Sequence, residues 1–312
     1  MILTAGEALI DWVSRERGAT LAAARHFERA PGGAPLNVAV GLARLGVRAG
    51  FAGCLAEDPF GDALAALLAA EGVDASLVRR VMGCQTRMAY VTTRADGDRE
   101  LAAFSRVACA DAAIAPSDLP VATLDHLDAF YFGSLILQGA PARGAVLEAA
   151  ARVRAAGGLV MFDPNVRLVL WPDRQKLLRV LEAALTVATV VKLGEDELAL
   201  LGTLGPGITV LTTHGAQGAE VRWAGGQVRV AAPAVDVVDT TGAGDGFVAG
   251  VLAELTALKR ADERLAAVPD RLDAAGWTRV LTRASAVGGL VCTRTGAIAA
   301  LPTRAELDAF SP

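Results

Sequence analysis

The sequence lacks both of the common glycine-rich nucleotide-binding motifs. No G-x-x-x-x-G-K-[ST] segment occurs among its 312 residues, and no G-x-G-x-x-G segment follows a predicted strand. The first motif cradles phosphates in P-loop nucleotide hydrolases, and the second marks dinucleotide-binding oxidoreductases. Neither class is therefore supported, and any phosphate must be bound by another part of the chain.

Basic runs, long apolar runs and a basic leader are also absent. The formal net charge is -4, and the 30 Lys and Arg residues are not clustered as nucleic-acid or anionic-membrane binding requires. The sequence contains no uninterrupted run of about 18 apolar residues, so we predict no membrane-spanning helix. The first residues, MILTAGEALIDWV, contain Glu7 and Asp11, so we do not expect a signal peptide. We expect neither a nucleic-acid nor a membrane partner.

Cysteines and aromatic residues are scarce. Cys54, Cys84, Cys109 and Cys292 are widely spaced and form no C-x-x-C pair. This spacing disfavours a zinc knuckle and a redox motif, and we expect free thiols in a cytoplasmic protein. Aromatic residues make up 5% of the chain and hydrophobic residues 53%, so the core must consist mainly of Ala, Val and Leu. That composition suits α/β layers better than an all-β sandwich.

Strand-like apolar runs alternate with helical patterns along most of the chain. We predict strands at residues 1–10, 47–53, 128–133, 158–163, 187–193 and 207–213, and a hairpin at 219–223 and 227–231. We predict helices at residues 35–45, 59–71, 142–156, 173–184 and 195–202. The alternation indicates βαβ units around a largely parallel sheet, and therefore a doubly wound α/β fold.

Two segments interrupt this alternation. Residues 86–106 are typical of two strands joined at Asp96-Gly97, because Gly accepts the positive φ of a tight hairpin turn. Residues 11–30 form an irregular insertion after the first strand. The two segments could pair into a small β lid beside the carboxyl edge of the sheet, where ligands of open α/β sheets bind. A surface hairpin without function is the alternative. We predict a single domain over residues 1–312.

The segment DTTGAGD, residues 239–245, carries the strongest chemical signal. Its glycines Gly242 and Gly244 precede the apolar face of a predicted helix, so they lie at a helix N-terminus. Unpaired N–H groups and the helix dipole bind anions there, and Gly allows a phosphate to approach closely. Asp245, in the first turn, could take a proton from a hydroxyl while the backbone amides stabilise a transferring phosphoryl group. A helix that merely starts with Gly and Asp is the alternative.

A second glycine cluster, PGGAPLN, opens another predicted helix. Pro35 suits the first turn, and Gly46 can end the helix. Asn37 offers both a donor and an acceptor to a polyhydroxyl ligand. A role in capping the backbone is equally compatible with this motif alone.

Together the segments GGAPLNVAVGLARLG and DTTGAGDGFVAGVL resemble the two signatures of the ribokinase-like, or PfkB-type, carbohydrate kinase family. Between them GEALID, FDPNVR, KLGEDEL and THGAQG occur in the order found in that family, so the resemblance spans essentially the whole chain. It implies a ribokinase-like three-layer α/β/α sandwich with a mainly parallel central sheet and a small β-sheet lid. It also implies an ATP-dependent sugar kinase.

The resemblance implies a role for individual residues at the reaction centre. Asp245 corresponds to the catalytic base, and the anion hole is formed by Gly242, Ala243 and Gly244. The positions that match sugar-binding residues are Asp11, Gly32, Gly33 and Asn37. Arg106 and Arg167 are further candidates, because a guanidinium can hold a substrate carboxylate or the γ-phosphate.

The resemblance also implies nucleotide and metal contacts. The residues that it implies for the nucleotide are Glu197, Thr213, Gly215, Gly218, Gly242 and Gly244. Glu197 corresponds to the Glu that organises Mg²⁺ through water, but Gly194 stands where the family has Asn, which puts the local phosphate geometry in doubt. Lys192, two residues before Gly194, is a further candidate because its charge could compensate for the missing Asn, and a plain residue at a strand end is the alternative. The backbone carbonyls of Asp239 and Thr241 match a site for a monovalent cation such as K⁺.

The substrate is less well specified than the reaction. The segments around Arg106 and Arg167 resemble the fructokinase branch and also 2-keto-3-deoxygluconate kinases. The sequences of DTTGAGDGF, FDPNVR and VKLGEDEL favour fructokinase. A ribokinase or nucleoside kinase is the next alternative, and a non-catalytic sugar-binding protein of the same fold is the alternative from another class. We expect a homodimer formed through the lid, because one face of a small sheet needs covering.

Overall fold

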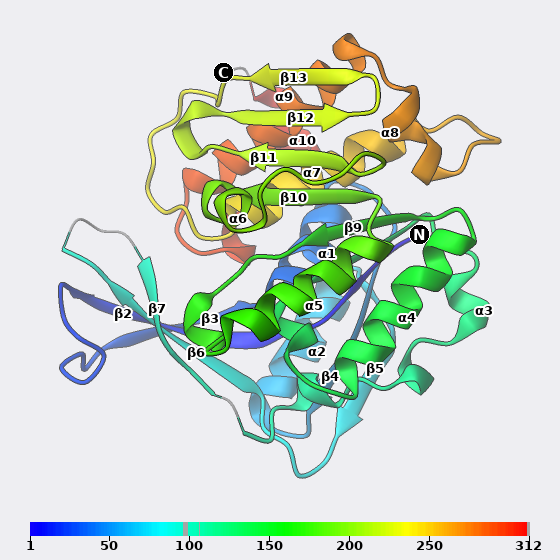
Figure 1. The fold of residues 1–312 in the computed structure, drawn as a ribbon. Helices are drawn as coiled ribbons and strands as arrows, with labels where there is room; N and C mark the ends of the chain where they lie inside the picture. The colour runs from blue at the N-terminus through cyan, green and yellow to red at the C-terminus, as the bar shows by residue number, and fades with distance from the viewer. Residues whose placement is uncertain (96–98, 106, 311–312) are drawn as a thin grey trace.

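The computed structural model describes residues 1–95, 99–105 and 107–310, and it contains two sheets (Figure 1). The large sheet has nine strands in the order β13-β12-β11-β10-β9-β8-β1-β4-β5. Its strands are β1 (Ile2–Ala5), β4 (Ala49–Ala56), β5 (Asp74–Val81), β8 (Ala129–Gly133), β9 (Leu159–Asp163), β10 (Val190–Gly194), β11 (Thr209–Thr213), β12 (Ala219–Trp223) and β13 (Gly226–Val230). Neighbours from β5 to β11 pair in parallel, and only β12 and β13 pair antiparallel.

Helices cover both faces of the large sheet because successive residues of its strands point to opposite sides. In β8, Phe130 and Phe132 enter one core cluster with α4 (Ala142–Ala155) and α5 (Arg174–Val187). Tyr131 between them enters a second cluster with α1 (Ala34–Arg44), α7 (Ala243–Leu258) and α9 (Ala274–Cys292). The other helices are α2 (Pro59–Ala70), α3 (Val121–Leu124), α6 (Glu195–Leu201), α8 (Val268–Arg271) and α10 (Arg304–Ala309). The predicted three-layer α/β/α fold is confirmed.

The small sheet projects from the body beside the large one (Figure 1). Its strands are β3 (Phe27–Gly32), β2 (Leu9–Arg17), β6 (Arg87–Thr93) and β7 (Arg99–Phe104), in that spatial order. β2 pairs antiparallel with β3 and parallel with β6, so the two inserted segments meet along this central pair. The predicted turn at Asp96-Gly97 lies outside the described residues.

Two details of the predicted strands are wrong. Residues 1–10 do not form one strand, because the chain leaves the large sheet at Gly6 and enters the small sheet at Leu9. Gly6 has a φ of 150°, and a Cβ on it would lie 2.7 Å from Cγ of Pro35. Residues 11–30 are also more regular than expected, because they contain most of β2 and β3.

Several elements of the structure have no counterpart among the predicted ones, and the longest of them are β5 and α9. The edge strand β5 contains Arg79 and Arg80, whose charges interrupt its apolar pattern and pair with Asp118 and Asp62. The long helix α9 packs against α7 behind the large sheet. Within the described ranges, no helix is long and apolar enough to cross a bilayer.

Candidate active site

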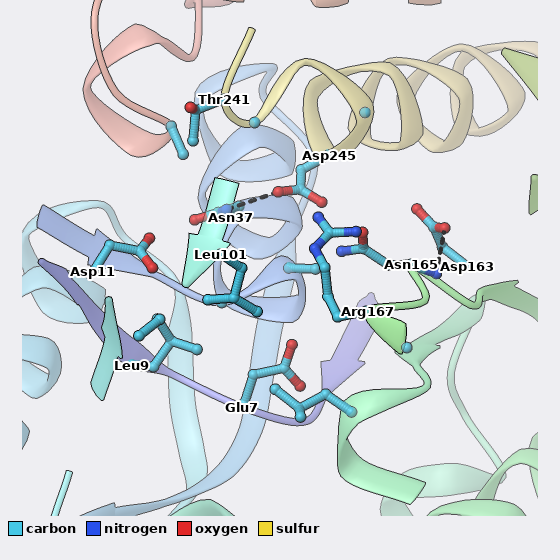
Figure 2. A pocket seen from close by; sticks show the side chains of 18 of the residues that line it. Glu7, Leu9, Asp11, Asn37, Leu101, Asp163, Asn165, Arg167, Thr241 and Asp245 are labelled. Atoms are coloured by element: carbon cyan, nitrogen blue, oxygen red, sulfur yellow. Dashed lines mark hydrogen bonds between the residues drawn. The ribbon is translucent and has the colours of Figure 1, made fainter. Parts of the chain in front are cut away.

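A cavity of about 430 Å³ lies where the carboxyl ends of the central strands face the small sheet. This volume is in the range of small-molecule sites. Its lining includes Asp11 and Leu101 from the small sheet, Asp163 and Lys192 from strands β9 and β10, and Asp245 from α7 (Figure 2). The folded chain therefore gathers polar groups from distant segments at the edge where open α/β sheets bind ligands.

The N-terminus of α7 forms one wall of this cavity. Gly242 caps the helix with a φ of 81°, and a Cβ on it would lie 2.8 Å from Ala297, so the position requires glycine. Gly242 and Gly244 line the cavity, whereas the Ala243 side chain packs against a buried cluster. A Cβ on Gly244 would lie 3.3 Å from Nζ of Lys192. The N–H of Ala243 donates to the carbonyl oxygen of Thr240, and the neighbouring N–H groups at this helix start are suited to an anion.

Asp245 occupies the first turn of α7 and is 9% exposed. Its Oδ2 accepts a 2.7 Å hydrogen bond from Nδ2 of Asn37 in α1, which joins two segments that are 208 residues apart (Figure 2). Burial raises the pKa of Asp245, and the Asn37 hydrogen bond and the charges of Lys192 and Arg167 only partly offset this effect. A carboxylate with a raised pKa is a better match for accepting a proton near neutral pH.

The glycine pair before α1 lets the chain pack closely against the first segment. A Cβ on Gly32 would lie 2.2 Å from Oδ2 of Asp11, and a Cβ on Gly33, whose φ is 110°, would lie 2.5 Å from the carbonyl oxygen of Glu7. Asp11, Gly33 and Asn37 all line the cavity. Oδ1 of Asn37 is buried without a hydrogen-bond partner in the described part of the chain. Such an oxygen is suited to accept a hydrogen bond from a ligand.

Lys192, in the middle of β10, forms a buried ion pair with Asp163 at the end of β9. The Nζ to Oδ2 distance is 3.3 Å, and the side chains are 10% and 1% exposed. Burial lowers the pKa of Lys192, but the nearby carboxylates, Asp163 foremost, outweigh it and raise the pKa overall. Burial raises the pKa of Asp163, and Lys192 opposes that rise. The ammonium thus stays charged next to the helix start of α7.

Glu197 is held by two backbone hydrogen bonds. Its Oε1 accepts from N–H of Val166 and its Oε2 from N–H of Gly194, each at 2.7 Å. The carboxylate therefore ties the start of α6 to the loop that carries Arg167. Figure 2 shows the Arg167 side chain extending toward Asp245. Among the described residues, no three His, Cys, Asp or Glu side chains meet as a metal-binding group.

A second hollow of about 450 Å³ adjoins the cavity and shares Asn165, Arg167 and Lys192 with it. Thr213, Gly215 and Glu197 also line this hollow. Gly218 has another role, because a Cβ there would lie 1.9 Å from the carbonyl oxygen of Val230. Its glycine allows the turn to pack against the end of β13.

Asp239 connects the loop before α7 to the loop after α9. Its Oδ1 accepts hydrogen bonds from N–H and Oγ1 of Thr241, and its Oδ2 accepts one from N–H of Gly296 at 2.7 Å. These bonds fix the backbone that leads into Gly242. The predicted cation contacts use backbone carbonyls of this loop and remain a prediction.

Several cavity residues were not assigned from the sequence, among them the carboxylates Glu7 and Asp163, and one predicted residue is not described. Glu7 lines the cavity but was predicted inside a continuous strand. Its signal was a carboxylate directly after Gly6 in an otherwise apolar segment. Asp163 appeared only as part of the FDPNVR segment. Arg106 lies outside the described residues.

The fold and the site together define a phosphotransferase that acts on a small hydroxyl compound. A buried carboxylate stands beside an anion-binding helix N-terminus, and amide and carboxylate groups suited to hydroxyls line the same cavity. The assignment to phosphotransferases rests on both features together, because either feature alone also occurs in α/β proteins of other function.

Comparisons with known proteins identify the family. The sequence matches the pfkB family of carbohydrate kinases over residues 1–304. It is 37% identical over 324 aligned residues to the probable fructokinase-4 of Arabidopsis thaliana, covering 99% of this chain and 96% of the relative. The chain therefore belongs to the pfkB family of carbohydrate kinases, and the resemblance noted in the sequence is confirmed.

Solved structures agree with this assignment. The fructokinase with bound ATP from Xylella fastidiosa superposes with a TM-score of 0.88 at 32% identity, covering 99% of this chain and 97% of the other. The aminoimidazole riboside kinase from Salmonella enterica, complexed with aminoimidazole riboside and an ATP analog, has a TM-score of 0.82 at 32% identity. That superposition covers 99% of this chain and 98% of the other. The protein is thus a carbohydrate kinase with the ribokinase-like fold.

Proposed function

We propose that this kinase transfers the γ-phosphate of ATP to a hydroxyl group of D-fructose. The observation that carries the proposal is the Asp245 carboxylate, held by Asn37 beside the glycine-rich start of α7 in a cavity lined by hydroxyl-binding groups. Full-length relatives named fructokinases support fructose as the sugar. A 2-keto-3-deoxygluconate kinase is the main alternative substrate class.

The proposed mechanism assigns each step to residues of this chain. Asp11 and Asn37 hold sugar hydroxyls, and Asp245 removes the proton of the attacking hydroxyl. That oxygen then attacks the γ-phosphorus in line with the bond that breaks, and ADP leaves. The N–H groups at Gly242, Ala243 and Gly244, with Lys192 and Arg167, stabilise the charge on the transferring group.

We propose cation contacts that are compatible with the observed hydrogen bonds. Mg²⁺ supplies charge neutralisation for nucleotide phosphates in such reactions. Both oxygens of Glu197 accept backbone hydrogen bonds, so this residue fits a role through water better than direct ligation. Glu197, Thr213 and Gly215 would face the nucleotide, and the carbonyls of Asp239 and Thr241 would hold K⁺.

We further propose that the small sheet is a lid and a dimer interface. Closure of β2, β3, β6 and β7 over the sugar would exclude water and so limit hydrolysis of ATP. A second copy covering the outer face of the lid would bury the surface of this thin sheet. Four free cysteines support the cytoplasm as the proposed location.

A coupled ADP-release assay tests the substrate directly. The panel contains fructose, 2-keto-3-deoxygluconate, ribose and adenosine, each with ATP and Mg²⁺. We expect the highest kcat/KM with fructose. Higher kcat/KM with the acidic sugar would overturn the choice of substrate and point to Arg167 as a carboxylate ligand. Absence of turnover with every compound would support a sugar-binding protein instead.

A further inference from the structure

Glu7 is a buried carboxyl group in the cavity, and it lies where the chain passes from β1 to β2. It is 4% exposed and lines the same cavity as Asp11, Asn37 and Asp245. Figure 2 shows its side chain at the floor of this cavity. The backbone around it is packed on two sides, since Gly6 donates a hydrogen bond to Ala52 and Gly33 abuts the Glu7 carbonyl. The carboxyl group is therefore held in place.

One oxygen of this carboxyl group is left without a hydrogen-bond partner by the part of the chain that the structure describes. Oε2 of Glu7 is buried and unpartnered within the described residues. An unsatisfied buried polar atom costs about 1–3 kcal/mol, and such atoms in native proteins usually have a specific explanation. Oδ1 of Asn37, in the same cavity, is unpartnered as well. Two unpartnered oxygens in one cavity indicate a ligand that supplies hydroxyl groups.

Burial, more than the neighbouring charges, favours the neutral form of Glu7. Arg87 is engaged by Asp111, with hydrogen bonds of 2.5 and 2.8 Å, and by the carbonyl of Ser105. Burial raises the pKa of Glu7 to about 8, and Asp111 and Asp245 add to the rise while its own backbone hydrogen bond and Arg87 oppose it. A neutral carboxyl group can donate one hydrogen bond and accept others, as a sugar hydroxyl requires.

We propose that Glu7 binds a hydroxyl group of the sugar through its unpartnered oxygen and so contributes to sugar affinity and sugar choice. This inference rests on the proposed function. Glu7 would be an additional sugar-binding residue on the side of the cavity that the connection between β1 and β2 forms. Asp11 and Asn37 would hold other hydroxyls of the same molecule.

Two variants separate sugar binding from a role in folding. Glu7→Leu keeps most of the volume and removes the hydrogen bonds, so we expect the fructose KM to rise roughly 3- to 20-fold, with the ATP KM and kcat changing less than about twofold. Glu7→Gln resembles the neutral acid and should keep the fructose KM near that of the wild type at pH 7. Glu148→Leu, at an exposed position on α4 and away from the lid, is the control and should leave the fructose KM unchanged.

The pH profile of the fructose KM supplies a readout that a structural role would not change. Loss of the Glu7 proton near pH 8 should raise the wild-type KM roughly tenfold between pH 7 and pH 9. The Glu7→Gln enzyme should show no such rise in the fructose KM. If Glu7→Leu does not fold, this comparison alone tests whether Glu7 binds the sugar. The ATP KM should stay flat over this range.

The inference and the proposed function can fail separately. If the wild type phosphorylates fructose but Glu7→Leu keeps its fructose KM, or Glu7→Gln keeps the alkaline rise, Glu7 does not bind the sugar. If the wild type prefers another sugar of the panel, the same comparisons are made with that sugar. If calorimetry detects no binding of any of these sugars, the inference is overturned with the function.

Discussion

Asp245 is subject to two opposing influences. Its place in the first turn of α7 favours the carboxylate, whereas its burial favours the neutral acid, and burial is the larger effect on its pKa. Asn37 and the nearby cations keep the ionised form accessible. The raised pKa makes the Asp245 carboxylate a stronger base than an exposed aspartate.

Replacing Asp245 by Asn tests its role as the base. Asn keeps the size of the side chain and an oxygen for the Asn37 hydrogen bond but cannot accept the hydroxyl proton. We expect kcat to fall by about 10²–10⁴, with fructose still bound in calorimetry and unfolding little changed. Asp62→Asn, at an exposed position on α2, should keep full activity. A kcat close to that of the wild type would exclude Asp245 as the base.

The pH dependence of catalysis provides a second test of the same residue. Because the base must be ionised and its pKa is raised above the ordinary 3.8, kcat should decrease as the pH falls through a value above 3.8. A pH-rate profile at saturating fructose and ATP measures this acid limb. The Glu7→Gln enzyme should show the same acid limb, since Glu7 does not take the proton. An acid limb at or below 3.8 would contradict the raised pKa.

At the scale of elements, the N-terminus of α7 depends on its backbone geometry. Gly242 combines a left-handed φ with a close contact to Ala297, and these features place the start of the helix at the wall of the cavity. Gly46, which follows α1, has a φ of 77° and no atom within 4 Å of its missing side chain. The two glycines have similar φ values. They differ mainly in that Gly242 contacts Ala297 and precedes α7, whereas Gly46 has no such contact and precedes β4.

This pair allows a matched test of the proposed anion site. Gly46→Ala should cost about 1–2 kcal/mol of stability through backbone strain alone, with normal kinetics. Gly242→Ala should add the clash with Ala297 and lower kcat by about 10² through misplaced N–H donors. Denaturant unfolding and steady-state kinetics on both variants measure these effects. Equal kinetics in the two variants would show that the start of α7 does not contact the phosphoryl group.

At the scale of the whole molecule, the lid should join two copies of the chain. We expect light scattering to give twice the chain mass of 32.0 kDa at micromolar concentration. Hydrogen exchange should show slower exchange in β2, β3, β6 and β7 as protein concentration increases, while the large sheet stays unchanged. A constant monomer mass over this range would contradict the dimer.

The free energy of unfolding of the whole molecule should depend on pH through Glu7. Its folded pKa of about 8 lies above the ordinary 4.5, so the stabilisation by the neutral acid is complete below pH 4.5 and is lost as the pH rises through 8. Between pH 5 and pH 8, wild-type stability should therefore fall relative to Glu7→Gln by up to about 1.4 kcal/mol per pH unit. Urea unfolding of both proteins across this range measures the difference. Parallel curves would indicate that Glu7 is not buried as a neutral acid.

The sequence by itself determined the layered fold and the chemical class of the site. The apolar periodicity of a strand or helix depends on residues that are close in sequence. Most of the strands of the large sheet and many of its helices were therefore predictable. The positive φ and close approach at Gly242 are likewise local requirements that glycine satisfies. These features pointed to phosphoryl transfer before any distance was known.

Only the tertiary structure decided how the parts of the site act on one another. It split residues 1–10 between two sheets at Gly6, where packing against Pro35 leaves no room for a side chain. It brought Asn37 to Asp245 across 208 residues and buried Glu7 with one oxygen that no described residue partners. Burial, hydrogen bonding and pKa depend on neighbours supplied by remote segments, and the local sequence pattern does not contain them.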